Sequence, residues 1–248
     1  MVDQITIIVS VILSVVGIYF VALMWSNAEL KSTFEKFSKL EAKQNIRIFN
    51  SKHVSVPYVV TKRLFDFIFS FFAMIFLLPI LLVVCILIKV DSKGPIMYKQ
   101  SRMGKNGKQF FAYKFRTMII NAKEVSSELP VRRDPRITRV GQFLRSTNID
   151  ELPAFISVLR GDMTLVGRSR AIEYHIIYDE LSREQRETLL NIKPGLVSLW
   201  AVSLNRVEFN FTGIYNYDFY YINKMSFPFD LKILLGAFII MFGSVSQH

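Results

Sequence analysis

Apolar residues gather in two long runs near the start of the chain, and shorter periodic or alternating segments follow. The first run, from Ile5 to Trp25, carries no charged residue and is long enough to cross the hydrocarbon core of a bilayer. It predicts a transmembrane helix within residues 1–27, uncleaved, with Trp25 at the interface. A cleaved signal peptide is the alternative, because Ser26-Asn-Ala28 loosely fits a cleavage site, but no Lys or Arg precedes this long run.

The second run, from Leu64 to Ile88, also has spanning length, but it contains Asp66 and Pro79 and has basic residues on both sides. The positive-inside tendency draws both ends to the cytoplasmic face, and a proline in mid-helix removes a hydrogen bond and bends the chain. We therefore predict a re-entrant helix over residues 64–88 that breaks near Pro79. A proline-kinked spanning helix is the alternative. A second crossing is disfavoured by the basic residues that follow the first helix, because they place the later part of the chain in the cytoplasm. These residues are Lys31, Lys36, Lys39, Lys43, Arg47 and Lys52.

Between the two runs, residues 28–58 have the pattern of an amphipathic helix. Leu30, Phe34, Phe37 and Leu40 recur at helical spacing, and Glu and Lys occupy the other faces. This segment is predicted to be a linker that either continues the membrane helix or lies on the lipid headgroups.

The periodicity changes after the second run. Two alternating segments, Ile96–Arg102 and Gln109–Phe115, flank Asn106-Gly107 and predict a β-hairpin with lysines at its tip. Ser182-Arg-Glu-Gln185 opens a helix as a capping box, which Lys193-Pro-Gly195 ends. A mainly apolar helix over residues 230–245 is expected to rest on the bilayer. Residues 59–248 have the size of one domain, with a body at 89–228.

Two adjacent carboxylates, Asp150 and Glu151, stand at the start of another helical pattern. Pro153 suits a first helical turn, and Asn148 is the expected cap. The pair is then expected where backbone N–H groups point outward, a place that anions and phosphates favour. The alternative is that both carboxylates only complement the helix dipole.

The chain is basic, with a net charge of +11 concentrated between Lys89 and Arg145. This excess can attract anionic headgroups, nucleic acid or a phosphorylated small molecule. Nucleic acid is disfavoured because no binding module is visible and because the basic residues adjoin the membrane segment. The chain has one cysteine, which excludes an internal disulfide. Its three histidines are scattered and do not have the spacing of metal ligands. Neither a dinucleotide-binding glycine motif nor a P-loop occurs.

A series of short motifs from Thr61 to the C-terminus resembles the monotopic phosphoglycosyl transferases, the bacterial sugar transferases that act on undecaprenyl phosphate. The matching stretches, in family order, are Lys62-Arg-Leu-Phe-Asp66, Asp91-Ser-Lys-Gly-Pro95, Lys114-Phe-Arg-Thr-Met118, Asp134-Pro-Arg-Ile-Thr-Arg-Val-Gly141, Asp150-Glu-Leu-Pro153, Leu159-Arg-Gly-Asp-Met163, Lys193-Pro-Gly195 and Asp230-Leu-Lys-Ile-Leu234. The resemblance covers about three quarters of the chain. With the patterns above, it implies an α+β membrane protein with one N-terminal transmembrane helix, a re-entrant Pro-broken helix and a mainly helical cytoplasmic catalytic domain. That domain has a small β-hairpin and interfacial amphipathic helices.

The resemblance also implies an activity and its residues. Asp150 would attack the sugar-bearing phosphate of a UDP-sugar, release UMP and hold the phosphosugar until polyprenyl phosphate takes it. Glu151 would bind Mg²⁺, a hard cation that prefers carboxylate and phosphate oxygens. Phosphates would be held by basic residues at matching or neighbouring positions: Lys114, Arg116, Arg145, Arg168 and Arg170. Asp134, Arg136 and Asp162 are expected to organise loops.

The implied setting is the bacterial inner membrane, with the catalytic domain facing the cytoplasm and polysaccharide synthesis, such as exopolysaccharide, as the pathway. A homodimer or a pathway glycosyltransferase is the implied protein partner. Three features depart from the family pattern. Leu78 precedes Pro79 where serine is frequent, Ser169 stands where arginine usually binds phosphate, and residues 196–203 lack the more polar, glycine-containing run of the family. Ser169 supports an alternative, a non-catalytic membrane adaptor that keeps the transferase fold, and the intact carboxylate pair argues against it. A membrane-tethered nucleic-acid binder is a more distant alternative.

Overall fold

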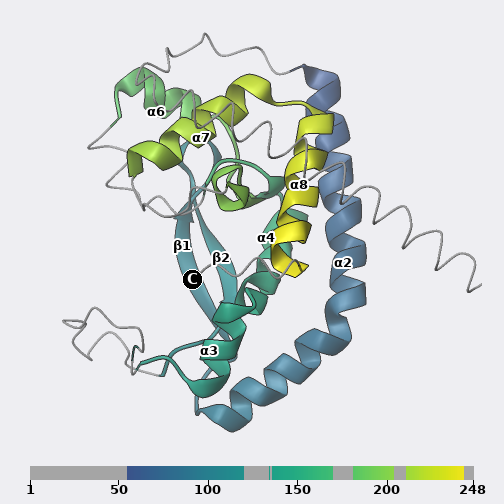
Figure 1. The fold of residues 1–248 in the computed structure, drawn as a ribbon, viewed down its shortest axis with the longest axis vertical. Helices are drawn as coiled ribbons and strands as arrows, with labels where there is room; N and C mark the ends of the chain where they lie inside the picture. The colour runs from purple at the N-terminus through teal and green to yellow at the C-terminus, as the bar shows by residue number, and fades with distance from the viewer. Residues whose placement is uncertain (1–54, 120–133, 135, 170–180, 204–210, 243–248) are drawn as a thin grey trace, which may run out of the picture.

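The computed structural model describes residues 55–119, 134, 136–169, 181–203 and 211–242. The predicted transmembrane helix at 1–27 and nearly all of the 28–58 linker lie outside these ranges, as does Arg170. The described part is mixed helix and strand, in agreement with the α+β class. Its dominant element is the long helix α2, at the right of Figure 1.

Helix α2 runs from Val56 to Asp91, with Ser55 and Ser92 as its end residues. The predicted apolar helix is thus confirmed, and it is longer than residues 64–88 at both ends. Its 36 residues contain Pro79, and the ribbon bends sharply in its lower part (Figure 1). Sharp kinks are typical of prolines inside helices, because the missing N–H and the ring disturb the preceding turn. The helix is bent but continuous through Pro79, so the predicted break and the side of the membrane on which each end lies stay predictions.

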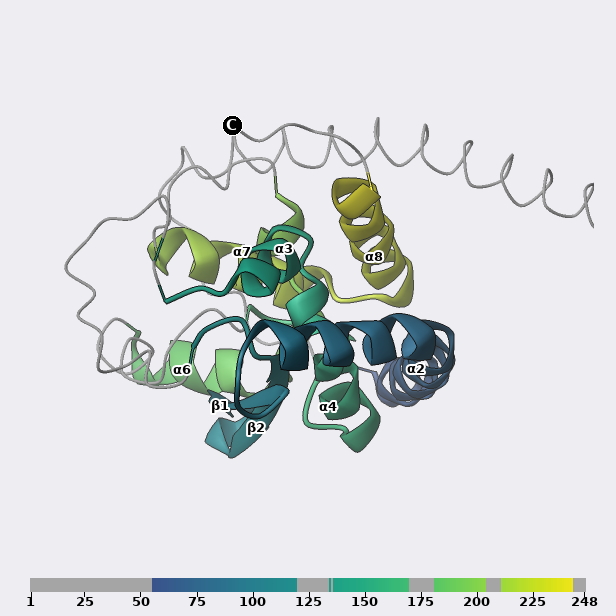
Figure 2. The same cartoon turned by 90° about the horizontal axis from the view of Figure 1, so that it is seen from below.

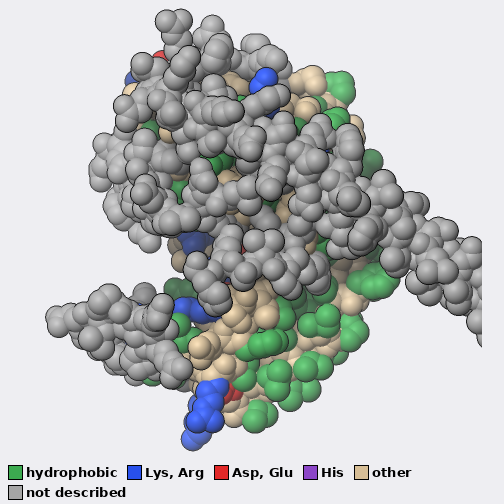
Figure 3. All heavy atoms as spheres, viewed as in Figure 1, with side chains coloured by type: hydrophobic (Ala, Val, Ile, Leu, Met, Phe, Trp, Pro, Cys, Tyr) green, Lys and Arg blue, Asp and Glu red, His purple; other side chains and the backbone are tan. Residues whose placement is uncertain are grey.

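Large apolar side chains on α2 face outward rather than into a core. Phe76 is 83% exposed, and Phe72, Phe71, Leu78 and Leu82 are each about half exposed or more. Hydrophobic side chains cover the lower right of the space-filling view, over the part of the molecule where α2 runs (Figure 3). Within the described ranges, α2 is the one helix with the length and composition to cross a membrane. An apolar surface of this extent is typical of a segment buried in lipid.

The predicted hairpin is confirmed. Strand β1 (Met97–Met103) pairs antiparallel with β2 (Gln109–Phe115), and Met97 lies opposite Phe115. The tip, Lys105–Gly107, forms a 3-10 turn (η1) in which Asn106 has φ +56° and Gly107 has φ +73°. These two residue types tolerate the left-handed region, which explains why Asn-Gly marks the turn.

Short elements complete the body. After α3 (Arg139–Ser146), η2 (Ile149–Ala154) and α4 (Phe155–Arg160), strand β3 (Thr164–Val166) pairs in parallel with β4 (Gly195–Val197), a pairing that the sequence analysis did not predict. Helix α6 (Arg183–Leu190) begins with the predicted capping box at Ser182 and Gln185, but it ends three residues before Lys193. The remaining elements are η3 (Trp200–Val202), α7 (Phe211–Lys224) and α8 (Phe227–Phe242).

The largest core cluster joins α4, β3, η3, α7 and α8 around Val158, Leu165 and Tyr221. Helix α8 corresponds to the predicted C-terminal helix, although it starts at Phe227 rather than at 230. Seen from below, α4 and the hairpin lie on one side of α2, and α3, α7 and α8 lie on the other (Figure 2). In Figure 1 the bent helix runs along one edge of the body and passes beneath it.

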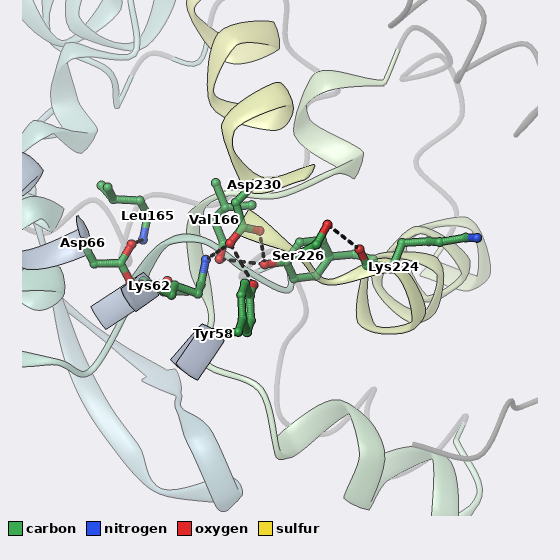
Figure 4. A network of polar contacts seen from close by, with 10 residues as sticks. Tyr58, Lys62, Asp66, Leu165, Val166, Lys224, Ser226 and Asp230 are labelled. Atoms are coloured by element: carbon green, nitrogen blue, oxygen red, sulfur yellow. Dashed lines mark hydrogen bonds and ion pairs between the residues drawn. The ribbon is translucent and has the colours of Figure 1, made fainter. Parts of the chain in front are cut away.

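A buried polar network fixes the start of α2 to the C-terminal helices (Figure 4). Asp230 of α8 accepts from Lys62 Nζ at 2.6 Å and from the Tyr58 hydroxyl at 2.8 Å. The Tyr221 hydroxyl of α7 lies 2.7 Å from the other Asp230 oxygen and 3.1 Å from the Val166 carbonyl. The network orients α2 against three elements that are far from it in sequence.

A second carboxylate of α2 contacts strand β3. Asp66 is 3% exposed, and it accepts from the Thr164 hydroxyl and from the backbone N–H of Leu165. A buried charge is tolerated where hydrogen bonds satisfy it, and these two bonds explain an aspartate inside an apolar run.

Candidate active site

The Asp150–Glu151 pair lies at the start of η2, just after α3. Asn148 adopts the left-handed conformation at φ +56°, and the Glu151 N–H donates to its backbone carbonyl. The expected side-chain cap at Asn148 is wrong, because its side chain makes no capping bond. The α-helix also begins later than predicted, at Phe155, since Pro153 has no N–H to donate to Ile149 and the pair occupies a 3-10 turn instead.

Strand β2 brings Lys114 to this pair. The Lys114 ammonium lies 2.8 Å from Glu151 Oε1, and both side chains are between one fifth and one third exposed. Lys114 and Glu151 therefore form an ion pair that solvent, or a ligand, can still reach. A phosphate is a natural third member of such a group, because lysine binds phosphate as a compact point charge.

The second cation of the site, Arg145, comes from the last turn of α3. Its Nε donates to the Thr117 hydroxyl at 2.8 Å, and its two Nη groups have no partner among the described residues. Gly141 makes this arrangement possible, since a Cβ there would lie 2.1 Å from the Thr117 carbonyl oxygen. Only glycine allows α3 to approach the end of β2 this closely.

The surroundings raise the pKa of the Asp150 carboxyl. Partial burial is the main cause, and the adjacent Glu151 carboxylate adds to it, while Lys114 and Arg145 act in the opposite direction. Both cations are therefore close enough to Asp150 to influence its ionisation. A partly desolvated carboxylate is a stronger nucleophile than a hydrated surface aspartate once it is ionised, and the two cations favour its ionisation.

A neighbouring ion pair shapes the loop before α3. Asp134 accepts from the Arg136 side chain at 2.7 Å and from its backbone N–H. These hydrogen bonds lower the pKa of Asp134 to about 2, and Arg145 contributes at longer range. This geometry fits the loop-organising role that was expected of the two residues. The turn at Gly161 and Asp162 is likewise structural in its contacts, since the Asp162 N–H donates to the Ser157 carbonyl.

The structure does not bring two of the predicted phosphate ligands to the carboxylate pair. Arg116 donates to the carbonyls of Lys93, Ser92 and Ile88, at the C-terminal end of α2. Arg168 is 1% exposed and donates to the Met103 and Ile192 carbonyls. Burial lowers the pKa of Arg168 to about 10. Both guanidinium groups hold backbone segments together, so phosphate binding by them stays an untested prediction.

The sequence analysis did not predict two of the contacts around the site. Thr117 orients Arg145, and Asp218 of α7 accepts from the backbone N–H of Ser169 at 2.7 Å. Asp218 is fully buried, and burial raises its pKa to about 7. Neither residue has a local signal, because each acts on a segment distant in sequence. Ser169 itself is 2% exposed, so its side chain faces the interior.

Asp150 and Glu151 can supply some, but not all, of the oxygen ligands that a hard divalent cation needs. Within the described ranges, no group of three or more His, Cys, Asp or Glu residues could hold a metal ion. Glu151 with Asp150 fits Mg²⁺ in its usual enzyme setting, where one or two carboxylates share the ion with substrate phosphates and water. The donor set therefore fits a substrate-bound Mg²⁺ rather than a resident metal.

A partly buried carboxylate pair beside two cations, on a body attached to an exposed apolar helix, defines a membrane-associated protein suited to phosphorylated ligands. Residues 57–244 match the family model of the bacterial sugar transferases, and the chain belongs to this family.

Three curated relatives illustrate the range of the family. The exopolysaccharide production protein PSS of Rhizobium leguminosarum bv. phaseoli is 39% identical over 193 residues, which cover 73% of this chain and 94% of that protein. The undecaprenyl-phosphate galactose phosphotransferase of Salmonella typhimurium is 38% identical over 70% of this chain and 38% of its own length. The UDP-glucose:undecaprenyl-phosphate glucose-1-phosphate transferase of Klebsiella pneumoniae is 37% identical over 71% and 39%, respectively. Apart from the Rhizobium protein, the matches in these relatives span well under half of their length.

Proposed function

We propose that this protein is an enzyme that transfers a phosphosugar from a UDP-sugar to a polyprenyl phosphate, such as undecaprenyl phosphate, and releases UMP. The observation that carries this proposal is the position of Asp150, partly desolvated, next to Glu151 and within electrostatic reach of Lys114 and Arg145. The names of the Salmonella and Klebsiella relatives support the acceptor, and that of the Klebsiella relative supports the donor class.

The proposed reaction has two displacements at one phosphorus atom. An Asp150 carboxylate oxygen bonds to the sugar-bearing phosphorus of the donor, and the bond from that phosphorus to the bridging oxygen breaks, so that UMP leaves. The phosphosugar is then an acyl phosphate on Asp150. A phosphate oxygen of the polyprenyl phosphate attacks the same phosphorus, Asp150 leaves as a carboxylate, and a polyprenyl diphosphosugar is formed.

The other residues of the site stabilise charge and hold the substrate. Lys114 neutralises the phosphoryl oxygens as charge shifts towards UMP, and Arg145 places its free Nη groups on a phosphate while Thr117 fixes its orientation. Glu151 would hold Mg²⁺ together with the substrate phosphates, and the ion would supply charge neutralisation. Arg170, outside the described residues, remains a predicted phosphate ligand.

Helix α2 would anchor this chemistry at the bacterial inner membrane. Its exposed apolar surface suits the hydrocarbon layer, and the polar network at Asp230 fixes it to the body. We place the catalytic domain on the cytoplasmic side, where nucleotide sugars are available and where the basic segments are favoured. A lipid acceptor then reaches Asp150 by diffusion in the membrane rather than through water.

The test is UMP release from a panel of UDP-sugars by purified protein with Mg²⁺ and undecaprenyl phosphate. Wild-type protein should release UMP with at least one donor, and Asp150→Asn should lower the rate by more than about a thousandfold. Glu187→Gln is the matched control, because Glu187 is an exposed carboxylate that pairs with Arg183 on the surface of α6. Folded wild-type protein that stays silent across the panel would support the adaptor instead.

A further inference from the structure

The two faces of the β1–β2 hairpin have different surroundings. On β2, Phe110 packs against the main core cluster, Ala112 is 2% exposed and Lys114 reaches Glu151. These alternate residues share one face of the strand, and the contact of Lys114 with Glu151 shows that this face is turned towards η2. Phe111, which lies between them, is 60% exposed on the outer face.

Tyr98 of β1 lies on the inner face, next to the site. It is the direct cross-strand partner of Lys114. Side chains that face each other in an antiparallel pair lie on the same side, with Cβ atoms about 5 Å apart. The Tyr98 and Lys114 side chains therefore project from neighbouring points of the same face, and the Lys114 ammonium lies 2.8 Å from Glu151 Oε1.

Tyr98 has the properties of a ligand-binding aromatic residue rather than of a core residue. Its side chain is 50% exposed although it lies on the inner face, and no hydrogen bond or ring contact engages it among the described residues. Tyr113 differs, since its outer-face ring is flanked by Arg160 and Lys99. A half-exposed aromatic ring without such contacts is available for stacking on a ligand.

Polar groups continue along the same face of β1. Gln100 and Arg102 follow Tyr98 at two-residue intervals, and Arg102 Nη2 donates to Gln100 Oε1 at 2.9 Å. This face of the edge strand thus presents an aromatic ring, an amide and a guanidinium in a row. A ligand with a flat ring on Tyr98 and phosphates at Lys114 would lie across the two strands, with the amide and the guanidinium further along the same face.

We infer that Tyr98 is a substrate-positioning residue that stacks on the nucleobase of a nucleoside diphosphate donor whose phosphates lie at Lys114 and Glu151. The inference rests on the proposed function, because it takes the phosphate position from that reaction. A base is favoured over the sugar because a flat π-system gains most from stacking on an aromatic ring. The residue makes no bond to the reacting phosphorus and acts through binding alone.

The experiment measures the affinity of UDP, which has the nucleoside and both phosphates but not the sugar to be transferred, by titration in detergent. Tyr98→Ala should weaken UDP binding about tenfold to a hundredfold, the usual effect of losing one stacked base. Tyr98→Phe should stay within about twofold of wild type. Phe111→Ala is the matched control, since it removes an aromatic ring of similar exposure from the opposite face of the same hairpin and should leave UDP affinity unchanged.

Turnover separates this inference from the proposed function. If Tyr98→Ala raises KM for the donor and leaves kcat nearly unchanged, the positioning role is supported. Unchanged UDP affinity in Tyr98→Ala overturns it, even when wild type releases UMP and Asp150→Asn does not. Loss of affinity for the UDP-sugar but not for UDP also overturns it, because the ring would then contact the sugar. Wild-type protein that binds no UDP overturns this inference, and it overturns the proposed function only if it also releases no UMP.

Discussion

In the proposed reaction the surroundings of Asp150 have two opposing effects, because partial burial favours its attack on phosphorus and also disfavours its charge. Its pKa is raised, so the folded protein holds the proton more tightly than the unfolded chain does. Ionised Asp150 therefore lowers stability at neutral pH, and this cost disappears as pH falls below the pKa of an ordinary aspartate. Active sites often show this conflict between activity and stability.

Asp150→Asn should therefore raise the melting temperature at neutral pH while it abolishes transfer. The gain should shrink as the pH is lowered towards the ordinary aspartate pKa, where the wild-type carboxyl is protonated in both states. Thermal unfolding of both proteins in the same detergent measures it. A lower melting temperature for Asp150→Asn at neutral pH would contradict the raised pKa.

Lys114 should set the acid limb of the pH–rate profile. Asp150 must be ionised to attack, so activity falls as pH drops through its pKa. Lys114 lowers that pKa, and Lys114→Met should move the acid limb of kcat/KM to higher pH as well as reduce the rate. Lys108→Met, at the exposed hairpin tip, is the control. A profile for Lys114→Met that keeps the wild-type acid limb would exclude this electrostatic coupling.

At the scale of elements, the Asp230 network decides how α2 meets the body. The Lys62 and Asp230 side chains are 15% and 6% exposed, so solvent screens this pair little. Asp230→Asn should cost about 3 kcal/mol, because it leaves a buried ammonium without its counter-charge. The double variant with Lys62→Met should cost less than the sum of the two single changes.

Thermal unfolding of the single and double variants measures this coupling. Glu187→Gln again serves as a control, since it breaks the exposed pair with Arg183 and should cost under about 0.5 kcal/mol. Strict additivity of the Lys62 and Asp230 changes would show that the two side chains do not interact in the membrane-bound protein.

The bend in α2 makes a prediction about topology. A straight helix of this length would measure about 54 Å, well beyond the roughly 30 Å of a hydrocarbon core. If α2 is re-entrant, cysteines placed at Ser55 and Ser92, in a Cys85→Ser background, should both react with an impermeant reagent from the cytoplasmic side. Labelling of the two ends from opposite sides would instead establish a spanning helix kinked at Pro79.

At the scale of the whole molecule, the apolar surface of α2 and the basic charge of +11 both favour a membrane, but they respond differently to salt. Headgroup attraction is screened, whereas burial of apolar side chains is not. A variant that lacks residues 1–54 should therefore stay with the membrane fraction in high salt and at alkaline pH. Release by either treatment would mean that α2 only lies on the surface.

Elements whose signals are local could be predicted from the amino-acid sequence. The hairpin follows from alternation around Asn106-Gly107, the start of α6 from its capping box, and α2 from an apolar run with one internal proline. The adjacent carboxylates could also be read directly, since neighbours in sequence stay neighbours in space. In each case the physical cause lies within a few residues of its effect.

Only the tertiary structure decided which basic residues meet the carboxylates. Lys114 and Arg145 reach the pair, whereas Arg116 and Arg168 hold backbone carbonyls, although all four looked alike in sequence. The choice depends on close packing between distant segments, such as Gly141 against Thr117. The β3–β4 pairing and the Asp230 network have the same origin, because a side chain's partner is fixed by the packing of whole elements and not by its neighbours in the chain.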